Sequence, residues 1–133
     1  MDVKPRVEDL VRDAERLAGR AVKEMDVDLR DAAEKAWGAT VRVVDALVLA
    51  RTGRKPEVAH ERRRELEAIC LKDSEAERRR IADRYSTRSD YLHAMCFYEG
   101  VCEPVEAVKR RIMETRGLVE DVKKLIEAPL GGS

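Results

Sequence analysis

The sequence predicts an all-α fold, an up-and-down bundle of four to five long helices. Apolar residues recur at the three- and four-residue steps of a helix from end to end, and no segment alternates with the period of two that a strand requires. Short connections between long amphipathic segments favour antiparallel helices. At 133 residues the chain is long enough to bury a core of its own. We therefore expect one domain over residues 1–128, followed by a loose tail at 129–133.

The first two helices have different apolar patterns. The first carries a single stripe at steps of four and three, formed by Val3, Val7, Leu10, Ala14, Leu17 and Ala21. The second is expected over residues 29–52. Its second half, from Val41 to Ala50, is apolar except for Arg42 and Asp45. We therefore expect this half to be the most buried element, at the centre of the bundle.

A third helix is expected over residues 57–71. Gly53 suits the left-handed position that ends the second helix, and Pro56 suits the first turn of the third. Three apolar residues at helical spacing would point inward from it: Leu66, Ile69 and Cys70.

A fourth helix is predicted to start at Ser74, because Ser74 and Glu77 form a capping-box pattern. It runs unbroken to Glu99, or it pauses near residues 85–87, where Thr87 could cap a separate piece. Gly100 ends it.

The last helix is expected to open at Glu103–Pro104. Its apolar stripe consists of Val105, Val108, Ile112, Val119, Val122 and Ile126.

The composition limits the possible functions. Hydrophobic residues make up 44% of the chain and charged residues 41%, with a net charge of +0, which argues against non-specific coating of nucleic acid. No apolar run approaches the roughly 18 residues of a membrane span, and the start lacks a secretory signal. We therefore expect a cytoplasmic protein without membrane contact. The absence of Asn and Gln is typical of hyperthermophile proteins.

The three cysteines, Cys70, Cys96 and Cys102, lack the close pairing of a zinc site. The favoured interpretation is that they are buried small hydrophobes. A disulfide between Cys96 and Cys102, or between Cys70 and Cys102, stays open as an alternative. No phosphate-cradling glycine loop or metal-binding helix motif is present, so we predict no cofactor and no metal.

The residues from Arg88 to Gly100 form the candidate site, because they hold three of the five aromatic residues and one of the two histidines. His93 can exchange protons near neutral pH, and Arg88 can hold a phosphate. On a regular helix the two are offset by roughly 140°, so they do not share a stripe. Three residues would support them: Asp90 by fixing the His93 tautomer, and Tyr91 and Tyr98 by stacking on a base or hydrogen-bonding a phosphate. The alternative is an aromatic-rich core helix with a histidine at its edge.

Two arginine triplets, at residues 62–64 and 78–80, also invite a nucleic-acid interpretation. Glutamates are interleaved with both, and Arg63–Glu67 and Glu75–Arg79 have ion-pair spacing. We therefore favour a salt-bridged, heat-stable surface.

Two segments together resemble the archaeal PaREP paralogous-repeat family, which is related to HEPN domains. They are Asp31-Ala-Ala-Glu-Lys-Ala-Trp-Gly-Ala39 and Ser89-Asp-Tyr-Leu-His-Ala-Met-Cys-Phe-Tyr-Glu-Gly100. The resemblance covers about residues 5–127. It implies a HEPN-like bundle that commonly forms a homodimer.

The resemblance also implies two functional classes. Many HEPN members are metal-independent endoribonucleases, of toxin or defence type, with an arginine followed after four to six residues by a histidine. Arg88 and His93 fit that spacing, whereas Ser89 departs from the residue usual after the arginine. The favoured expectation is a module that binds RNA or a nucleotide, or assembles with a partner such as a nucleotidyltransferase-like protein, without catalysis.

Overall fold

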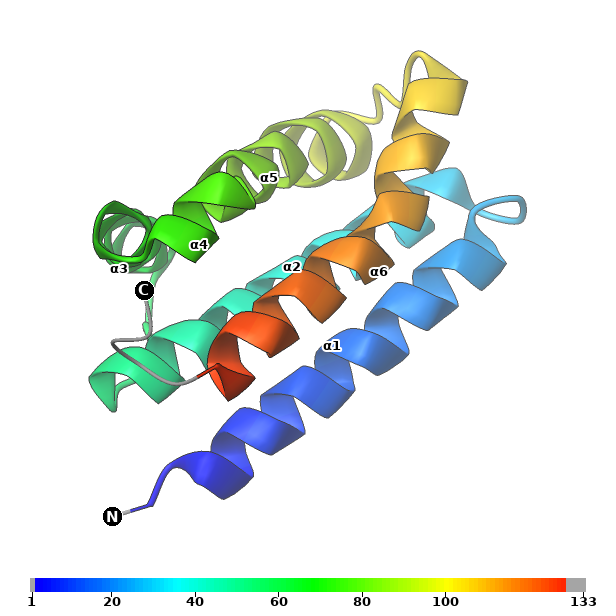
Figure 1. The fold of residues 1–133 in the computed structure, drawn as a ribbon. Helices are drawn as coiled ribbons and strands as arrows, with labels where there is room; N and C mark the ends of the chain where they lie inside the picture. Colours follow the sequence, from blue (N-terminus) through cyan, green and yellow to red (C-terminus); the bar gives the residue numbers. More distant parts are fainter. Residues whose placement is uncertain (1, 129–133) are drawn as a thin grey trace.

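Helices make up the described part of the chain, as the periodicity predicts. The computed structural model describes residues 2–128, and these contain no strand. Its elements are α1 (Lys4–Glu24), α2 (Leu29–Thr52), α3 (Ala59–Lys72), α4 (Ser74–Arg78), α5 (Ile81–Arg88), the π-helix η1 (Ser89–Tyr98) and α6 (Val105–Glu127). The helices pack as a bundle (Figure 1). The all-α prediction is confirmed.

Helix α2 is the centre of the packing. It contacts α1, α6, η1 and α3, and in Figure 1 α1 and α6 run along it. Residues Val43, Val44, Leu47, Val48 and Leu49 of α2 are fully buried. The expectation that the second half of this helix forms the middle of the core is confirmed. Removing so many large aliphatic side chains from water is the main favourable contribution to folding.

The elements α4, α5 and η1 follow one another across the bundle above α2 (Figure 1). The first of them is capped by Asp73 rather than by Ser74. The Asp73 carboxylate accepts hydrogen bonds from the amides of Glu75 and Ala76, at 3.0 and 3.2 Å. The predicted capping box is therefore wrong by one residue, because Asp caps as well as Ser does.

The chain breaks at Arg80 and not near residues 85–87, where α5 continues without interruption. Arg80 has φ 57° and lies in the left-handed region, which separates α4 from α5. Neither predicted course of the fourth helix anticipated this turn, since arginine has no preference for that conformation.

Other helix ends agree with the sequence in part. Gly53 ends α2 with φ 81°, as predicted. Helix α3 starts at Ala59, so Pro56 precedes its first turn instead of forming it. Val105 is 44% exposed and does not belong to the buried stripe of α6, because it is the first residue of that helix.

The cysteines take the alternative that the sequence left open. A disulfide joins Cys96 of η1 to Cys102 in the connection to α6, and Cys70 of α3 is a buried free thiol. No helix between residues 2 and 128 is long and apolar enough to cross a bilayer. The tail predicted at residues 129–133 lies outside the described residues.

Candidate functional site

The candidate segment lies on a π-helix. Residues Ser89–Tyr98 continue α5 with wider turns, in which backbone hydrogen bonds join residues five apart. At steps of four, Arg88, Leu92 and Cys96 are buried. His93 and Phe97 form a second row at the same step, with their rings stacked at a centroid distance of 6.5 Å. π-helical turns are rare in proteins, and many of those that occur lie at functional sites.

His93 lies against α2. Its Nδ1 atom is 2.8 Å from Oε1 of Glu34. Because an ionised carboxylate can only accept, Nδ1 is the donor in this contact, and in that tautomer Nε2 is the accepting nitrogen. The imidazole also stacks on Trp37, with ring centroids 5.4 Å apart and planes at 25°. Its side chain is 32% exposed, so His93 can still be reached from solvent.

Arg88 faces α6 instead. Its Nε donates to the hydroxyl of Thr115 at 3.0 Å, and its two terminal nitrogens donate to the carbonyl oxygens of Arg84 and Arg111, each at 3.2 Å. The residue is 5% exposed. Burial, together with the positive charge of the neighbouring Arg84, lowers the pKa of Arg88 to about 10. The guanidinium is therefore a buried cation held by neutral acceptors.

The structure thus gives Arg88 and His93 different neighbours. Arg88 is held by α5 and α6, whereas His93 is held by α2. Arg88 ends α5 and His93 lies in η1, and the two side chains share no partner.

The three supporting residues are all exposed. Asp90 was expected to fix the His93 tautomer, but Glu34 holds that position. Tyr91 lies under the guanidinium of Arg111, which is 4.3 Å from the ring centroid. Tyr98 meets His93 edge-on at 5.3 Å. Of these three residues, Tyr98 is the one whose ring packs against His93.

Glu34 is the partner that sequence reasoning missed. It lies in the Asp31–Ala39 segment, three residues before Trp37, and both contact His93. Residues three apart share a helix face. That spacing was the available signal, but nothing local connects it to a histidine 59 positions further along the chain.

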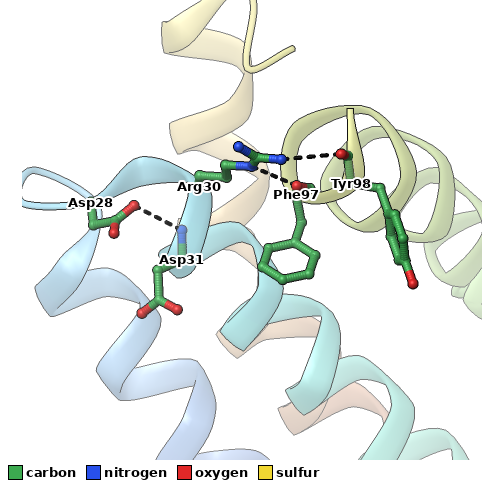
Figure 2. A pocket seen from close by; sticks show the side chains of 5 residues that line it. All are labelled: Asp28, Arg30, Asp31, Phe97 and Tyr98. Atoms are coloured by element: carbon green, nitrogen blue, oxygen red, sulfur yellow. Dashed lines mark hydrogen bonds between the residues drawn. The ribbon is translucent and has the colours of Figure 1, made fainter. Parts of the chain in front are cut away.

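A pocket of about 380 Å³ opens next to this contact, where η1 ends (Figure 2). It is lined by Asp28, Arg30, Asp31, Phe97 and Tyr98. Arg30 donates to the carbonyl oxygens of Phe97 at 2.5 Å and Tyr98 at 3.1 Å, and so caps the C-terminus of η1. The Tyr98 ring points away from Arg30 (Figure 2). Because Arg30 is engaged with the backbone, the pocket presents carboxylates and aromatic rings.

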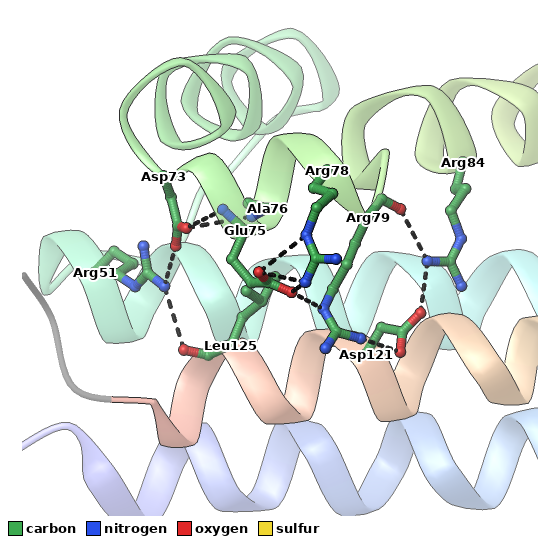
Figure 3. A network of polar contacts seen from close by, with 9 residues as sticks. All are labelled: Arg51, Asp73, Glu75, Ala76, Arg78, Arg79, Arg84, Asp121 and Leu125. Atoms are coloured by element: carbon green, nitrogen blue, oxygen red, sulfur yellow. Dashed lines mark hydrogen bonds and ion pairs between the residues drawn. The ribbon is translucent and has the colours of Figure 1, made fainter. Parts of the chain in front are cut away.

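The second arginine triplet lies in an ion-pair network (Figure 3). Arg78 and Arg79 both pair with Glu75, and Arg79 also reaches Asp121 of α6 at 2.7 Å. Arg84 pairs with the same Asp121 at 2.8 Å. The expected Glu75–Arg79 pair is confirmed. Arg79 of the triplet and Arg84 of α5 together hold this part of the chain to α6.

Two arginines of the first triplet, Arg62 and Arg63, make different contacts with the bundle. Arg62 pairs with Asp45, which is buried on α2, at 2.7 Å. Arg63 lies 5.9 Å above the centre of the Tyr85 ring. Both arginines therefore pack against the bundle. Residues 2–128 contain no group of three or more His, Cys, Asp or Glu side chains that could hold a metal ion.

Comparison with known families gave one match. The model of the family described as "Archaeal PaREP1/PaREP8 family" matches residues 9–119. Both segments that carry the resemblance lie inside this range, and they meet at the Glu34–His93 contact. Comparisons with curated proteins and with solved structures gave no match.

Proposed function

Because this chain belongs to the archaeal PaREP1/PaREP8 family, we propose that it is a HEPN-like helical module that acts by assembling with a protein partner, without catalysis. One observation carries the proposal. The guanidinium of Arg88, the group that an RNA-cleaving pair needs, is buried and donates to Thr115 and to two backbone carbonyls. A phosphate would have to displace those acceptors before Arg88 could stabilise its charge.

Charge supports assembly with protein over binding of RNA or a nucleotide at the same place. The pocket that Tyr98 lines also has the carboxylates of Asp28 and Asp31 in its wall, while Arg30 is held by backbone carbonyls. Stacking of a base on Tyr98 would bring a phosphate toward negative charge, which is unfavourable.

Metal-independent RNA cleavage is the second candidate, and the His93–Glu34 contact favours it. A histidine oriented by a carboxylate, with its other nitrogen free to accept a proton, is a suitable general base for a 2′-hydroxyl. In this alternative His93 would be the base and Arg88, after rearrangement, would stabilise the phosphate. Such a base typically contributes roughly 10²–10⁴-fold to the rate.

An RNA cleavage assay in EDTA separates the two candidates. The purified chain is incubated with single-stranded and with structured RNA at elevated temperature, beside His93→Ala and a matched exposed variant, His60→Ala. We expect the three proteins to leave the RNA equally intact. Cleavage by wild type and His60→Ala that is lost in His93→Ala, with unchanged circular dichroism, would establish catalysis and overturn the proposal.

Assembly has its own measurement. Light scattering at micromolar concentration distinguishes a monomer from the homodimer that the HEPN resemblance implies. Co-expression with an adjacent nucleotidyltransferase-like protein, where one is encoded, tests a heteromeric partner. A chain that stays monomeric and retains no partner would contradict the assembly proposal.

A further inference from the structure

Several exposed apolar residues lie in or beside the connections at one end of the bundle. Of the eight large hydrophobic residues that are exposed among residues 2–128, four belong to this end: Val27, Tyr98, Val101 and Val105. Val27 is 87% exposed and Tyr98 70%. Isolated exposed apolar residues are normal, but a group of them at one place marks an interaction site. We call these four residues the end surface.

The end surface is formed by two connections that lie at the same end of the molecule (Figure 1). Val27 belongs to the α1–α2 connection, and the other three run from the end of η1 to the start of α6. The two connections are joined by Lys109 of α6, whose Nζ lies 2.8 Å from Asp26.

The backbone of the end surface is held in place. The Cys96–Cys102 disulfide closes the connection after η1, and the amide of Val101 donates to the carbonyl of Met95 at 2.8 Å. Arg30 donates to the last two carbonyl oxygens of η1, those of Phe97 and Tyr98. A surface held this firmly loses little conformational freedom on binding, so more of the contact energy remains for affinity.

Exposed carboxylates lie in the same two connections and the first turn of α6: Asp28, Glu99, Glu103 and Glu106. Two cations of this end are engaged, since Arg30 donates to backbone carbonyls and Lys109 pairs with Asp26. The whole chain has a net charge of +0, so this acidic end is a local feature.

We propose that the end surface docks a basic amphipathic segment of a partner protein, with apolar side chains on Tyr98 and the valines and lysines or arginines on the carboxylates around them. This rests on the proposed assembly function and names the chemistry of the partner. Opposite charge at the rim guides the encounter and excludes wrong partners. Apolar anchors at the centre supply most of the affinity. The same rim disfavours RNA and disfavours the acidic end of a second copy.

Two labelled synthetic helical peptides test the proposal. They have equal length and the same leucine stripe, but one has lysine and the other glutamate on its polar face. Fluorescence anisotropy with the oxidised full-length chain gives the affinities. We expect the lysine peptide to bind in a salt-sensitive manner and the glutamate peptide not to bind. Equal binding of both peptides, or of neither, would overturn the proposal.

Variants locate the binding. Tyr98→Ala and Val101→Ser should each weaken the lysine peptide about tenfold, and the double charge reversal Glu103→Lys with Glu106→Lys should also remove the salt dependence. Leu71→Ser is the matched control, because Leu71 is 85% exposed on α3, away from this end. Equal weakening by Leu71→Ser would contradict the placement, provided that all variants keep the wild-type melting curve.

Two further outcomes would also overturn the inference. One is a dimer in light scattering that Tyr98→Ala dissociates, which would make the end surface a contact between copies. The other is displacement of the lysine peptide by single-stranded RNA whose binding Tyr98→Ala abolishes. Loss of peptide binding would overturn only the assignment of the end surface. The proposed function is tested separately, by the RNA cleavage assay and by co-purification with a partner.

Discussion

The Nδ1 atom of His93 lies 2.8 Å from the Oε1 atom of Glu34. This contact joins η1 to α2 across 59 positions of sequence and connects the two segments through which the chain resembles its family. The ring of Trp37, also on α2, stacks on the imidazole. His93 is therefore part of the packing between two helices as well as a side chain within reach of solvent.

The first prediction concerns the contribution of this contact to stability. We expect His93→Ala to lower the free energy of unfolding by about 1–2 kcal/mol, because it removes the stacking on Trp37 and a partly exposed hydrogen bond. Glu34→Ala should lower it by less. Guanidinium denaturation of both single variants and the double variant measures the coupling, and the double variant should lose less than the sum. Strict additivity would mean that the two side chains do not interact.

The second prediction separates the contribution of the volume of the Arg88 side chain from that of its charge. Arg88→Ala leaves a cavity beside Thr115 and should cost about 3 kcal/mol. Arg88→Met fills that space and removes a buried cation that has no carboxylate partner, so its cost should stay within about 1 kcal/mol. Thr115 keeps its own hydrogen bond to the Arg111 carbonyl in both variants. Chemical denaturation compares them, and an equally large loss in Arg88→Met would show that the guanidinium hydrogen bonds dominate.

The central part of the fold could be predicted from the sequence because its signal is local. From Val41 to Ala50 nearly every position of α2 is apolar, and only a central helix can bury all its faces. The ends of helices were less predictable, since Asp73 and Ser74 are adjacent and both are good caps. The turn at Arg80 carried no local signal, because nothing in an arginine side chain favours positive φ.

The candidate segment could be chosen from the sequence, but its geometry could not be predicted. The composition of Arg88–Gly100 marks it as the densest aromatic region of the chain. The direction of each side chain depends on the π-helical turns and on contacts with α2 and α6, which are long-range. The contacts of Arg88 with Thr115 and of His93 with Glu34 could not be read from the sequence, and Glu34 lies where Asp90 was expected.

A third prediction concerns how the stability of the protein depends on pH through the carboxyl group of Asp73. Burial raises the pKa of Asp73, but hydrogen bonds from Arg51 and from the amides of Ala76 and Glu75 outweigh it, so the pKa lies below its usual value. The stabilisation is therefore complete above about pH 4, the pKa of an unfolded Asp, and is lost as the pH falls through the lower folded value. Asp73→Asn keeps the cap but loses the charge. It should be less stable than wild type at pH 7 and should approach wild type below about pH 3, as measured by denaturation at both pH values. A constant difference would contradict the pKa shift.

A fourth prediction concerns the turn at Arg80. Its left-handed backbone costs about 1 kcal/mol for a residue with a Cβ, and its ion pair with Asp83 is solvent-exposed and contributes little. Arg80→Gly should therefore stabilise the protein by roughly 0.5 kcal/mol, after the greater freedom of glycine in the unfolded chain is subtracted. Arg64→Gly, at an exposed helical position of α3, is the control and should destabilise by about 1 kcal/mol. A loss of stability in both variants would argue against strain at Arg80.

The last prediction concerns the disulfide. Cys96–Cys102 closes a short loop, and a bond over such a loop contributes about 2 kcal/mol by restricting the unfolded chain. Reduction, or Cys102→Ser, should lower the free energy of unfolding by that amount and increase amide exchange in residues 99–104.

Burial raises the pKa of the Cys70 thiol, so alkylation of the folded, unreduced protein should be slow. After denaturation without reductant, mass spectrometry should find one alkylated cysteine per chain, and three after reduction. Three alkylated cysteines without reductant would show that the bond does not form. Cys70→Ala, which retains the disulfide, is the control: its exchange in residues 99–104 should stay at the wild-type level, because the Cys96–Cys102 bond is intact in it.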